Sequence, residues 1–341
     1  MPTRWRKSQN GFIPTGFNAV MFKSDREVLP SPMKAVLLMT YASVKSIDDL
    51  SAFYTHIFHG RPPAPDVLED AATRFRSIGV ADPLGSVSSR QAAALERRLK
   101  QLAGEDIRVY RAAKHTPPFI DDTVRRIAAD GVTRLYTLPL SPLYSRTGTA
   151  AYQLSVRKAV AAAGANLNVA DITDWHLFPA VVEAVSLRLR TALRWLSAAA
   201  RSKATVLFTA HSQPGLPEAN REYIQAFAEM AQAVAAQANC RHWMLAYRSA
   251  GPPPQKWLRP DVTDSIKEAA QTDSKAIVIC ELSSLTENVE AIFDCRIRCQ
   301  RQAEAYGLEF VMTEFLNDSS DFMDALADMI LERTVQPLAD S

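Results

Sequence analysis

Residues 204–214 read Ala-Thr-Val-Leu-Phe-Thr-Ala-His-Ser-Gln-Pro. The first seven are mostly apolar or β-branched, which predicts a buried strand, and His211 stands where that strand gives way to a turn at Pro214. In an open α/β sheet, ligands are bound at the carboxyl ends of the strands. The stretch therefore predicts a sheet with a histidine at its binding edge.

Short apolar runs alternate with longer helical patterns along the chain, which is typical of parallel sheets covered by helices. Ser88 with Gln91, and Ser284 with Glu287, fit the capping-box pattern of a helix start. The pattern predicts an α/β protein of two similar Rossmann-like domains, each a four-stranded parallel sheet flanked by helices, with a cleft between them. The expected strands are 34–41, 107–112, 135–140, 166–170, 204–210, 243–247, 276–280 and 308–312, and the expected helices include 48–59, 89–102, 121–129, 178–200 and 223–236.

The eight expected strands divide into two sets of four. We expect residues 33–172 to form the N-terminal domain and residues 173–318 the C-terminal domain, because a long helical segment follows the fourth strand. A helix at 319–333 is expected to pack back on the first domain. Residues 1–32 lack the alternation and are expected to form a flexible tail.

The composition is that of an ordinary globular protein. The chain has 341 residues, of which 47% are hydrophobic and 22% charged, and its net charge of +2 provides no electrostatic reason to bind nucleic acid. No apolar stretch reaches the roughly 18–20 residues needed to span a bilayer, and no apolar core of a secretory signal follows the early basic residues. We therefore expect a cytoplasmic protein that touches membranes at most peripherally.

Four cysteines, Cys240, Cys280, Cys295 and Cys299, raise the question of a metal cluster. Their spacing contains no Cys-x-x-Cys, the commoner hallmark of zinc or iron–sulfur ligation. Reduced, mostly buried thiols are the favoured interpretation in a cytosolic protein, and no iron–sulfur cluster is expected.

Several side chains that can do chemistry directly follow the expected strands. They are Tyr41, His115, Ser141, His211 and the segment 283–290. Right-handed parallel connections bring such strand ends to one edge of each sheet, so two halves that face each other would enclose a cleft lined by these residues.

His211 and Glu290 are the candidates for metal binding and proton transfer. An imidazole can coordinate a divalent metal or accept a proton at neutral pH, although a histidine at this position can equally cap the following turn. Glu290 lies near the start of an expected helix, with Asp294 four residues later, and a lone carboxylate there most often faces solvent. Facing each other across a cleft, the two would act as metal ligands or proton acceptors.

The remaining histidines have simpler interpretations. His56 and His59 lie three apart on an expected helix and could form a metal pair, but a packed or surface face is favoured. His176, beside Trp175, is expected in the packing between the halves, and His242 precedes a strand without an evident partner.

A series of short motifs from about residue 34 to 331 resembles the ferrochelatase family. The motifs, in chain order, are 35–41 (AVLLMTY), 54–63 (YTHIFHGRPP), 78–79 (IG) with 83–84 (PL), Gln91, 114–122 (KHTPPFIDD), 138–145 (LPLSPLYS) with Tyr152, 211–214 (HSQP), 245–249 (LAYRS) with Gly251, 257–260 (WLRP) and 287–290 (ENVE). Tyr41 and the segment 54–60 are most similar to the branch that metallates coproporphyrin III.

The resemblance implies a reaction and roles for individual residues. It implies insertion of Fe²⁺, a substrate, into a porphyrin in haem biosynthesis, with release of two protons and without an organic cofactor. His211 and Glu290 would flank the metal and carry out catalysis, and Tyr41 would face the metal from the other side. Tyr41, His115, Ser141, Tyr152 and Trp257 would bind the porphyrin. Family likeness also implies a monomer, with transient contacts to neighbouring haem-pathway enzymes or to a membrane surface.

The chain departs from the family pattern at several positions. Phe58 and His59 stand where paired arginines often lie, and Asn288 replaces the usual histidine. Arg296 and Arg298 interrupt a line of carboxylates that normally continues after Glu290, and Arg298 is placed to pair with Asp294 at i,i+4.

Further departures are Val80 and Arg248, which replace a glycine and a glutamine. The departures leave two alternatives open. One is a non-catalytic protein that binds a tetrapyrrole or haem, and the other is a cobalt or nickel chelatase acting on another tetrapyrrole.

Overall fold

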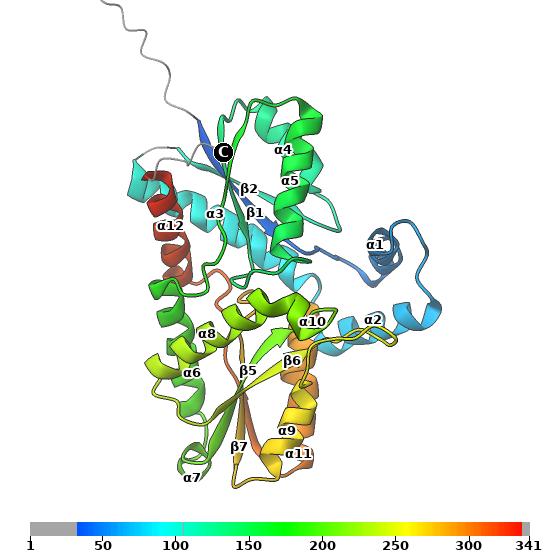
Figure 1. The fold of residues 1–341 in the computed structure, drawn as a ribbon, viewed down its shortest axis with the longest axis vertical. Helices are drawn as coiled ribbons and strands as arrows, with labels where there is room; N and C mark the ends of the chain where they lie inside the picture. The colour runs from blue at the N-terminus through cyan, green and yellow to red at the C-terminus, as the bar shows by residue number, and fades with distance from the viewer. Residues whose placement is uncertain (1–32, 105, 336–341) are drawn as a thin grey trace, which may run out of the picture. The chain divides into compact units, whose positions relative to one another are not determined.

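The computed structural model describes residues 33–104 and 106–335, so the tail expected at 1–32 lies outside the described residues. Within them the chain builds two four-stranded parallel sheets covered by helices, as the alternation predicts (Figure 1). The first half contains β1 (Lys34–Thr40), η1 (Ile47–Asp49), α1 (Leu50–Ile57), α2 (Pro65–Ile78), α3 (Pro83–Ala103), β2 (Arg108–Ala113), α4 (Ile120–Ala129), β3 (Arg134–Pro139), α5 (Thr149–Ala163) and β4 (Asn168–Asp171).

The second half repeats the same order of strands. It contains α6 (Pro179–Arg194), α7 (Ala198–Arg201), β5 (Ala204–His211), η2 (Pro217–Asn220), α8 (Arg221–Gln237), β6 (Trp243–Arg248), α9 (Val262–Ala270), β7 (Ala276–Glu281), α10 (Val289–Ala291), the π-helix η3 (Ile292–Arg298), α11 (Cys299–Ala305), β8 (Glu309–Met312) and α12 (Ser320–Val335). All pairings in both sheets are parallel.

The strand order places a binding crevice in each sheet. The first sheet runs β2-β1-β3-β4 and the second β6-β5-β7-β8, so the chain reverses its direction of winding between β1 and β3, and again between β5 and β7. Crevices at such switch points, outside the carboxyl ends of the strands, are where open α/β sheets bind ligands. Tyr41 follows β1, Ser141 follows β3, His211 ends β5 and Ser283 follows β7.

One apolar core joins the two sheets. A single cluster of buried residues includes Val36 and Leu38 of β1, Val206 and Phe208 of β5, and Phe322 of α12. The last helix, α12, lies beside α3 and α6 (Figure 1). An ion pair between Arg98 Nε and Asp324 Oδ1, at 2.7 Å, ties it to α3, and Arg188 donates to Asp321 from α6. Tertiary packing therefore connects the halves through a shared core and through α12.

Both predicted capping boxes are wrong. Helix α3 begins at Pro83 and is capped by Asp82, so Ser88 lies inside the helix, where its hydroxyl donates to the Gly85 carbonyl at 3.2 Å. Proline is well tolerated at the first helical position, which moves the start upstream of the expected one. The helix expected after Ser284 begins later, at Val289 of α10.

The helix expected at residues 178–200 is two helices. Helix α6 ends at Arg194, and Ser197 caps the short α7 by accepting a hydrogen bond from the Ala200 N–H at 3.2 Å. A serine hydroxyl competes for backbone donors and so favours a helix start over a helix interior. In the described parts of the chain, no helix combines the length and apolarity that a membrane crossing requires.

Candidate active site

The carboxyl ends of the two sheets contact each other directly. The Ser141 hydroxyl, after β3, donates to the backbone carbonyl of Ser283, after β7, at 3.1 Å. Farther along, the Thr147 hydroxyl donates to the Gln213 side-chain oxygen at 2.6 Å. Because these hydrogen bonds join one half to the other, they set the spacing of the two crevices.

His211 and Glu290 meet at the end of β5. Nε2 of His211 lies 3.2 Å from Oε2 of Glu290, and the side chains are 35% and 42% exposed. Nδ1 of His211 lies 2.6 Å from the Ser212 carbonyl, which can only accept, so Nδ1 carries a proton. Nε2 is therefore the atom that exchanges a proton or binds a metal, and it faces a carboxylate.

Glu290 is held by an unusual helical segment. Asn288 caps α10 by accepting a hydrogen bond from the Ala291 N–H at 2.9 Å, and the chain then continues as the π-helix η3. π-Helical turns are rare and occur frequently at functional sites. Partial burial alone would raise the pKa of Glu290, but the hydrogen bond and charge of His211, followed by the charges of Arg248 and Arg74, lower it to about 2. Glu290 is thus an anion at neutral pH.

The backbone around His211 is fixed by neighbouring hydroxyls. Its N–H donates to the Ser283 hydroxyl oxygen at 2.9 Å, and its carbonyl accepts from the Tyr223 hydroxyl at 2.7 Å. Ser283 in turn donates to Glu281 Oε1 from both its hydroxyl, at 2.6 Å, and its N–H, at 3.1 Å. The hydrogen bonds that run from the buried Glu281 carboxylate through Ser283 to the His211 backbone form the anchor that positions the imidazole.

That carboxylate, Glu281, pairs with Arg248, and both side chains are 1% exposed. Arg248 donates from Nε at 2.9 Å and from Nη2 at 3.1 Å to the two carboxylate oxygens, in the two-pronged geometry that suits a guanidinium. Burial raises the pKa of Glu281, but the charge and hydrogen bonds of Arg248 outweigh it and lower the pKa below the ordinary value. The pair is therefore ionic beneath the His211–Glu290 site.

Tyr41 and His115 lie together at the edge of the first sheet. Their ring centroids are 4.7 Å apart, and Nδ1 of His115 is 3.0 Å from Nδ1 of His56. Burial, followed by the nearby Lys114, His56 and His59, lowers the pKa of His115 to about 4. Burial, then the charge of Glu290, raises the pKa of Tyr41 well above its usual value. At neutral pH this edge therefore holds an uncharged imidazole and an uncharged phenol.

The other expected porphyrin-binding residues lie around these groups. Tyr152 is buried, and the Lys114 ammonium lies 5.6 Å from its ring centroid. Trp257 forms a β-bridge with Pro214, which places its backbone beside the segment after His211, and its ring lies against Gly251. Leu143 and Leu258 are buried in the main core.

Sequence reasoning missed Arg74 and the role of Glu281. Arg74, on α2, places Nη1 3.7 Å from Glu290 Oε1, whereas His211 contacts the other carboxylate oxygen, Oε2. The signal for Glu281 was available, because it is a charged residue that continues the apolar run 276–280. No comparable local signal marked Arg74, one of several basic residues on an exposed helix.

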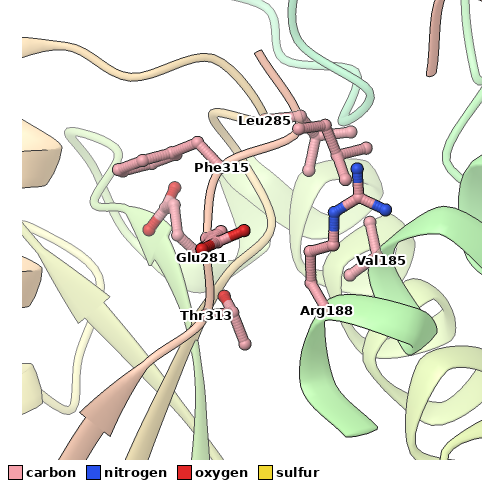
Figure 2. A pocket seen from close by; sticks show the side chains of 8 residues that line it. Val185, Arg188, Glu281, Leu285, Thr313 and Phe315 are labelled. Carbon is pink, nitrogen blue, oxygen red and sulfur yellow. The ribbon is translucent and has the colours of Figure 1, made fainter. Parts of the chain in front are cut away.

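Two hollows lie near the site, and His211 and Glu290 line neither of them. A cavity with room for about one water molecule lies between Val185 and Arg188 of α6 and Glu281, Thr313 and Leu285 (Figure 2). A larger hollow of about 890 Å³, including space open to solvent, is lined by residues 144–146 and 218–223. It includes Tyr223, which donates to the His211 carbonyl.

Among the cysteines and the remaining histidines, Cys295 and His56 contact residues of the site: Cys295 Sγ lies 3.7 Å from Glu281 Oε2, and His56 lies beside His115. All four cysteines are free thiols, and Cys280, Cys295 and Cys299 are buried. Among the described residues, no group of three or more His, Cys, Asp or Glu side chains is placed to hold a metal ion. Nε2 of His176 lies 3.1 Å from Glu229 of α8, so this contact connects His176 to the second half.

The fold and this crevice define the class of protein. SirB from Bacillus subtilis with Fe³⁺ aligns with 89% of this chain and 96% of its own, with a TM-score of 0.55 at 12% identity. The sirohydrochlorin chelatase SirB from Bacillus subtilis subspecies spizizenii, in complex with cobalt, aligns with 88% and 94%, with a TM-score of 0.52 at 10% identity. The chain therefore has the two-sheet chelatase fold.

Sequence similarity identifies the family within that fold. The ferrochelatase family model matches residues 33–334. The coproporphyrin III ferrochelatase of Geobacillus thermodenitrificans is 30% identical over 301 residues, which cover 87% of this chain and 95% of that protein. The ferrochelatase of Herpetosiphon aurantiacus is 29% identical and covers 88% and 99%. The chain belongs to the ferrochelatase family, the lyases that insert iron into a porphyrin in haem biosynthesis.

Proposed function

We propose that this protein inserts Fe²⁺ into coproporphyrin III in the cytoplasm, as a monomer and without an organic cofactor. The observation that carries the proposal is the pairing of His211 Nε2 with Glu290 Oε2, 3.2 Å apart, at the switch point of the second sheet. Several similar proteins are coproporphyrin III ferrochelatases, which supports the choice of porphyrin.

The chemistry requires two protons to leave the pyrrole nitrogens as one Fe²⁺ enters. Because Nδ1 of His211 carries a proton, Nε2 either shares a further proton with Glu290 or presents a lone pair. The same two atoms can therefore accept a pyrrole proton or hold the incoming metal, and the pair passes each proton to solvent through its exposed edge. The anionic Glu290 also lowers the electrostatic energy of a dication beside it.

Tyr41 and His115 would act on the other side of the macrocycle. The raised pKa of Tyr41 and the lowered pKa of His115 keep both side chains uncharged at neutral pH. Neither therefore places a positive charge in the path of Fe²⁺. We propose that Tyr41 faces the metal, that Tyr152 and Trp257 pack against the porphyrin, and that Ser141 maintains the cleft through its hydrogen bond to Ser283.

Cationic side chains suit a substrate with four carboxylates such as coproporphyrin III. Burial lowers the pKa of Lys114, whose ammonium donates to the Thr147 carbonyl at 3.3 Å and lies over Tyr152. Arg74 pairs with Asp70 at 2.5 Å and with Glu290 at 3.7 Å, but its buried Nε has no hydrogen-bond partner and its side chain is 27% exposed. A propionate beside either cation would compensate for its partial burial.

The test is an anaerobic assay of metallation with Fe²⁺ and either coproporphyrin III or protoporphyrin IX, followed by porphyrin absorbance. His211→Ala should lower kcat by at least about 100-fold, because general acid–base groups typically contribute 10²–10⁴-fold. His242→Ala, which changes an exposed histidine just before β6, is the matched control and should retain the wild-type rate. Turnover equal to background in the wild type would overturn the proposal, and faster turnover of protoporphyrin IX would overturn the choice of porphyrin.

A non-catalytic tetrapyrrole carrier is the second candidate. The observation that favours it is that Arg248 and Arg298 lie among the carboxylates behind Glu290. A carrier would bind both porphyrins saturably, as followed by quenching of porphyrin fluorescence, and would show no metallation above background. If the protein is a carrier, substitution of His211 should leave its affinity for porphyrin unchanged.

A further inference from the structure

The carboxylates behind Glu290 are already paired with arginines of the protein. Glu290, Asp294 and Arg298 are spaced four residues apart along α10 and η3, so they follow one side of the helical segment. Asp294 is 7% exposed at its side chain and Asp261, which caps α9, is 12% exposed. Carboxylates this deeply buried need a compensating positive charge.

Arg298 supplies that charge between the two aspartates. Its Nη2 lies 2.9 Å from Asp261 Oδ1, and its Nη1 lies 3.4 Å from Asp294 Oδ1. Nη2 also donates to the Thr263 hydroxyl at 3.3 Å, and that hydroxyl donates to Asp261 at 2.6 Å. One guanidinium thus bridges two separate elements, η3 and the start of α9.

The same arrangement continues inward to the buried pair. The other oxygen of Asp294 accepts a hydrogen bond from the Ser249 hydroxyl at 2.5 Å, and Arg248 donates to that hydroxyl at 3.1 Å. Arg248 then pairs with Glu281. Carboxylates and guanidinium groups therefore alternate from the outer end of η3 to the anchor beneath His211.

A divalent ion could enter this line only by displacing a guanidinium from a partly buried carboxylate, which is costly. Glu290 and His211, by contrast, remain 42% and 35% exposed. We propose that Arg298 occupies the place of a divalent cation between Asp294 and Asp261, so that Fe²⁺ reaches Glu290 and His211 from the cleft and not along the helix. The inference rests on the function proposed above and specifies its metal route.

The first test is a titration of the full-length protein with Co²⁺ in the absence of porphyrin, followed by calorimetry and by visible absorption of the bound ion. Arg298→Gln should bind one more Co²⁺ than the wild type, and the additional ion should be lost in Arg298→Gln/Asp294→Asn. Arg296→Gln, which removes an exposed arginine from the same helix, should bind the same number as the wild type. Equal numbers for Arg298→Gln and the wild type would overturn the proposal.

Arg298→Lys tests the explanation by charge, because it keeps a cation between the aspartates and should bind no additional ion.

A second test uses kinetics and does not depend on the folding of any Arg298 variant. Asp294→Asn should change the KM for Fe²⁺ by no more than about twofold, and a rise of tenfold or more would show that iron travels along the helix. The difference in Co²⁺ number is measured without turnover, so an inactive wild type would refute the proposed function while leaving this inference testable.

Discussion

The buried Arg248–Glu281 pair gives the most demanding prediction for stability. Each side chain is 1% exposed, and the two are joined by hydrogen bonds of 2.9 and 3.1 Å. Arg248→Met removes the guanidinium and leaves the buried Glu281 carboxylate without a cation, so that only neutral groups donate hydrogen bonds to it. Breaking a buried pair by removing one partner costs about 3–5 kcal/mol, which is a large part of a domain's usual free energy of unfolding of about 5–15 kcal/mol.

Glu281→Gln tests the other partner. It leaves a buried guanidinium without its carboxylate, and we expect a loss of similar size, about 3–5 kcal/mol. The double variant Arg248→Met/Glu281→Gln buries no unpaired charge, so its loss should be at least about 2 kcal/mol smaller than the sum of the single losses. Activity should recover less than stability, because the uncharged amide oxygen is a weaker acceptor than Glu281 Oε1 for the two Ser283 donors, and Ser283 positions His211.

Urea unfolding followed by circular dichroism measures these losses, and the metallation assay measures activity. Arg259→Met is the matched control, because its 3.5 Å pair with Asp264 is 68% exposed on both sides and should contribute no more than about 1 kcal/mol. A loss below about 1 kcal/mol for Arg248→Met, or strict additivity in the double variant, would refute the reasoning.

Three further changes test other contacts of the site. Because burial and neighbouring basic groups lower the pKa of His115 from 6.5 to about 4, the unfolded chain binds a proton between these values that the folded protein does not. Stability should therefore fall as the pH drops through this window. Urea titrations at pH 7 and pH 4 measure the loss, and His115→Gln should make it smaller by roughly 2–3 kcal/mol. An equal loss in the variant and the wild type would contradict the lowered pKa of His115. Gly251→Ala would place a Cβ 2.4 Å from the Trp257 ring. We expect a stability loss of about 1–3 kcal/mol and weaker porphyrin binding, measured by fluorescence. Wild-type values of stability and binding would show that the ring is free to move. Asn288→Ala removes the cap next to Glu290 and should cost about 1 kcal/mol and raise the KM for Fe²⁺, and an unchanged melting temperature and KM would refute a positioning role.

Local sequence determined which residues stand at the ends of the strands. The apolar run 204–210 and the turn after it place His211 at a strand end whatever packs around it, because burial and turn chemistry depend on the neighbouring residues. The same reasoning placed Tyr41 and Ser141 after β1 and β3, and the number of strands and their places along the chain followed from the alternation. Helix starts were less predictable, as Ser88 and Ser284 show, because several serines compete for the same role.

Tertiary structure alone decided which of these residues meet. Glu290 lies 79 positions after His211 in the chain, and the 3.2 Å contact between them depends on the π-helix after Asn288 and on the packing of η3 against β7. Arg74 reaches Glu290 from a helix of the first half, which no sequence spacing indicates.

The charges of the site were decided in the same way. The pattern of residues predicted an i,i+4 pair between Asp294 and Arg298, and the structure contains it, but the second partner, Asp261, comes from another element. An isolated sequence specifies the kind of charge at each position. Its pairing, its burial and therefore its pKa arise from groups brought together by the fold, because electrostatic energies depend on distance and on the exclusion of water.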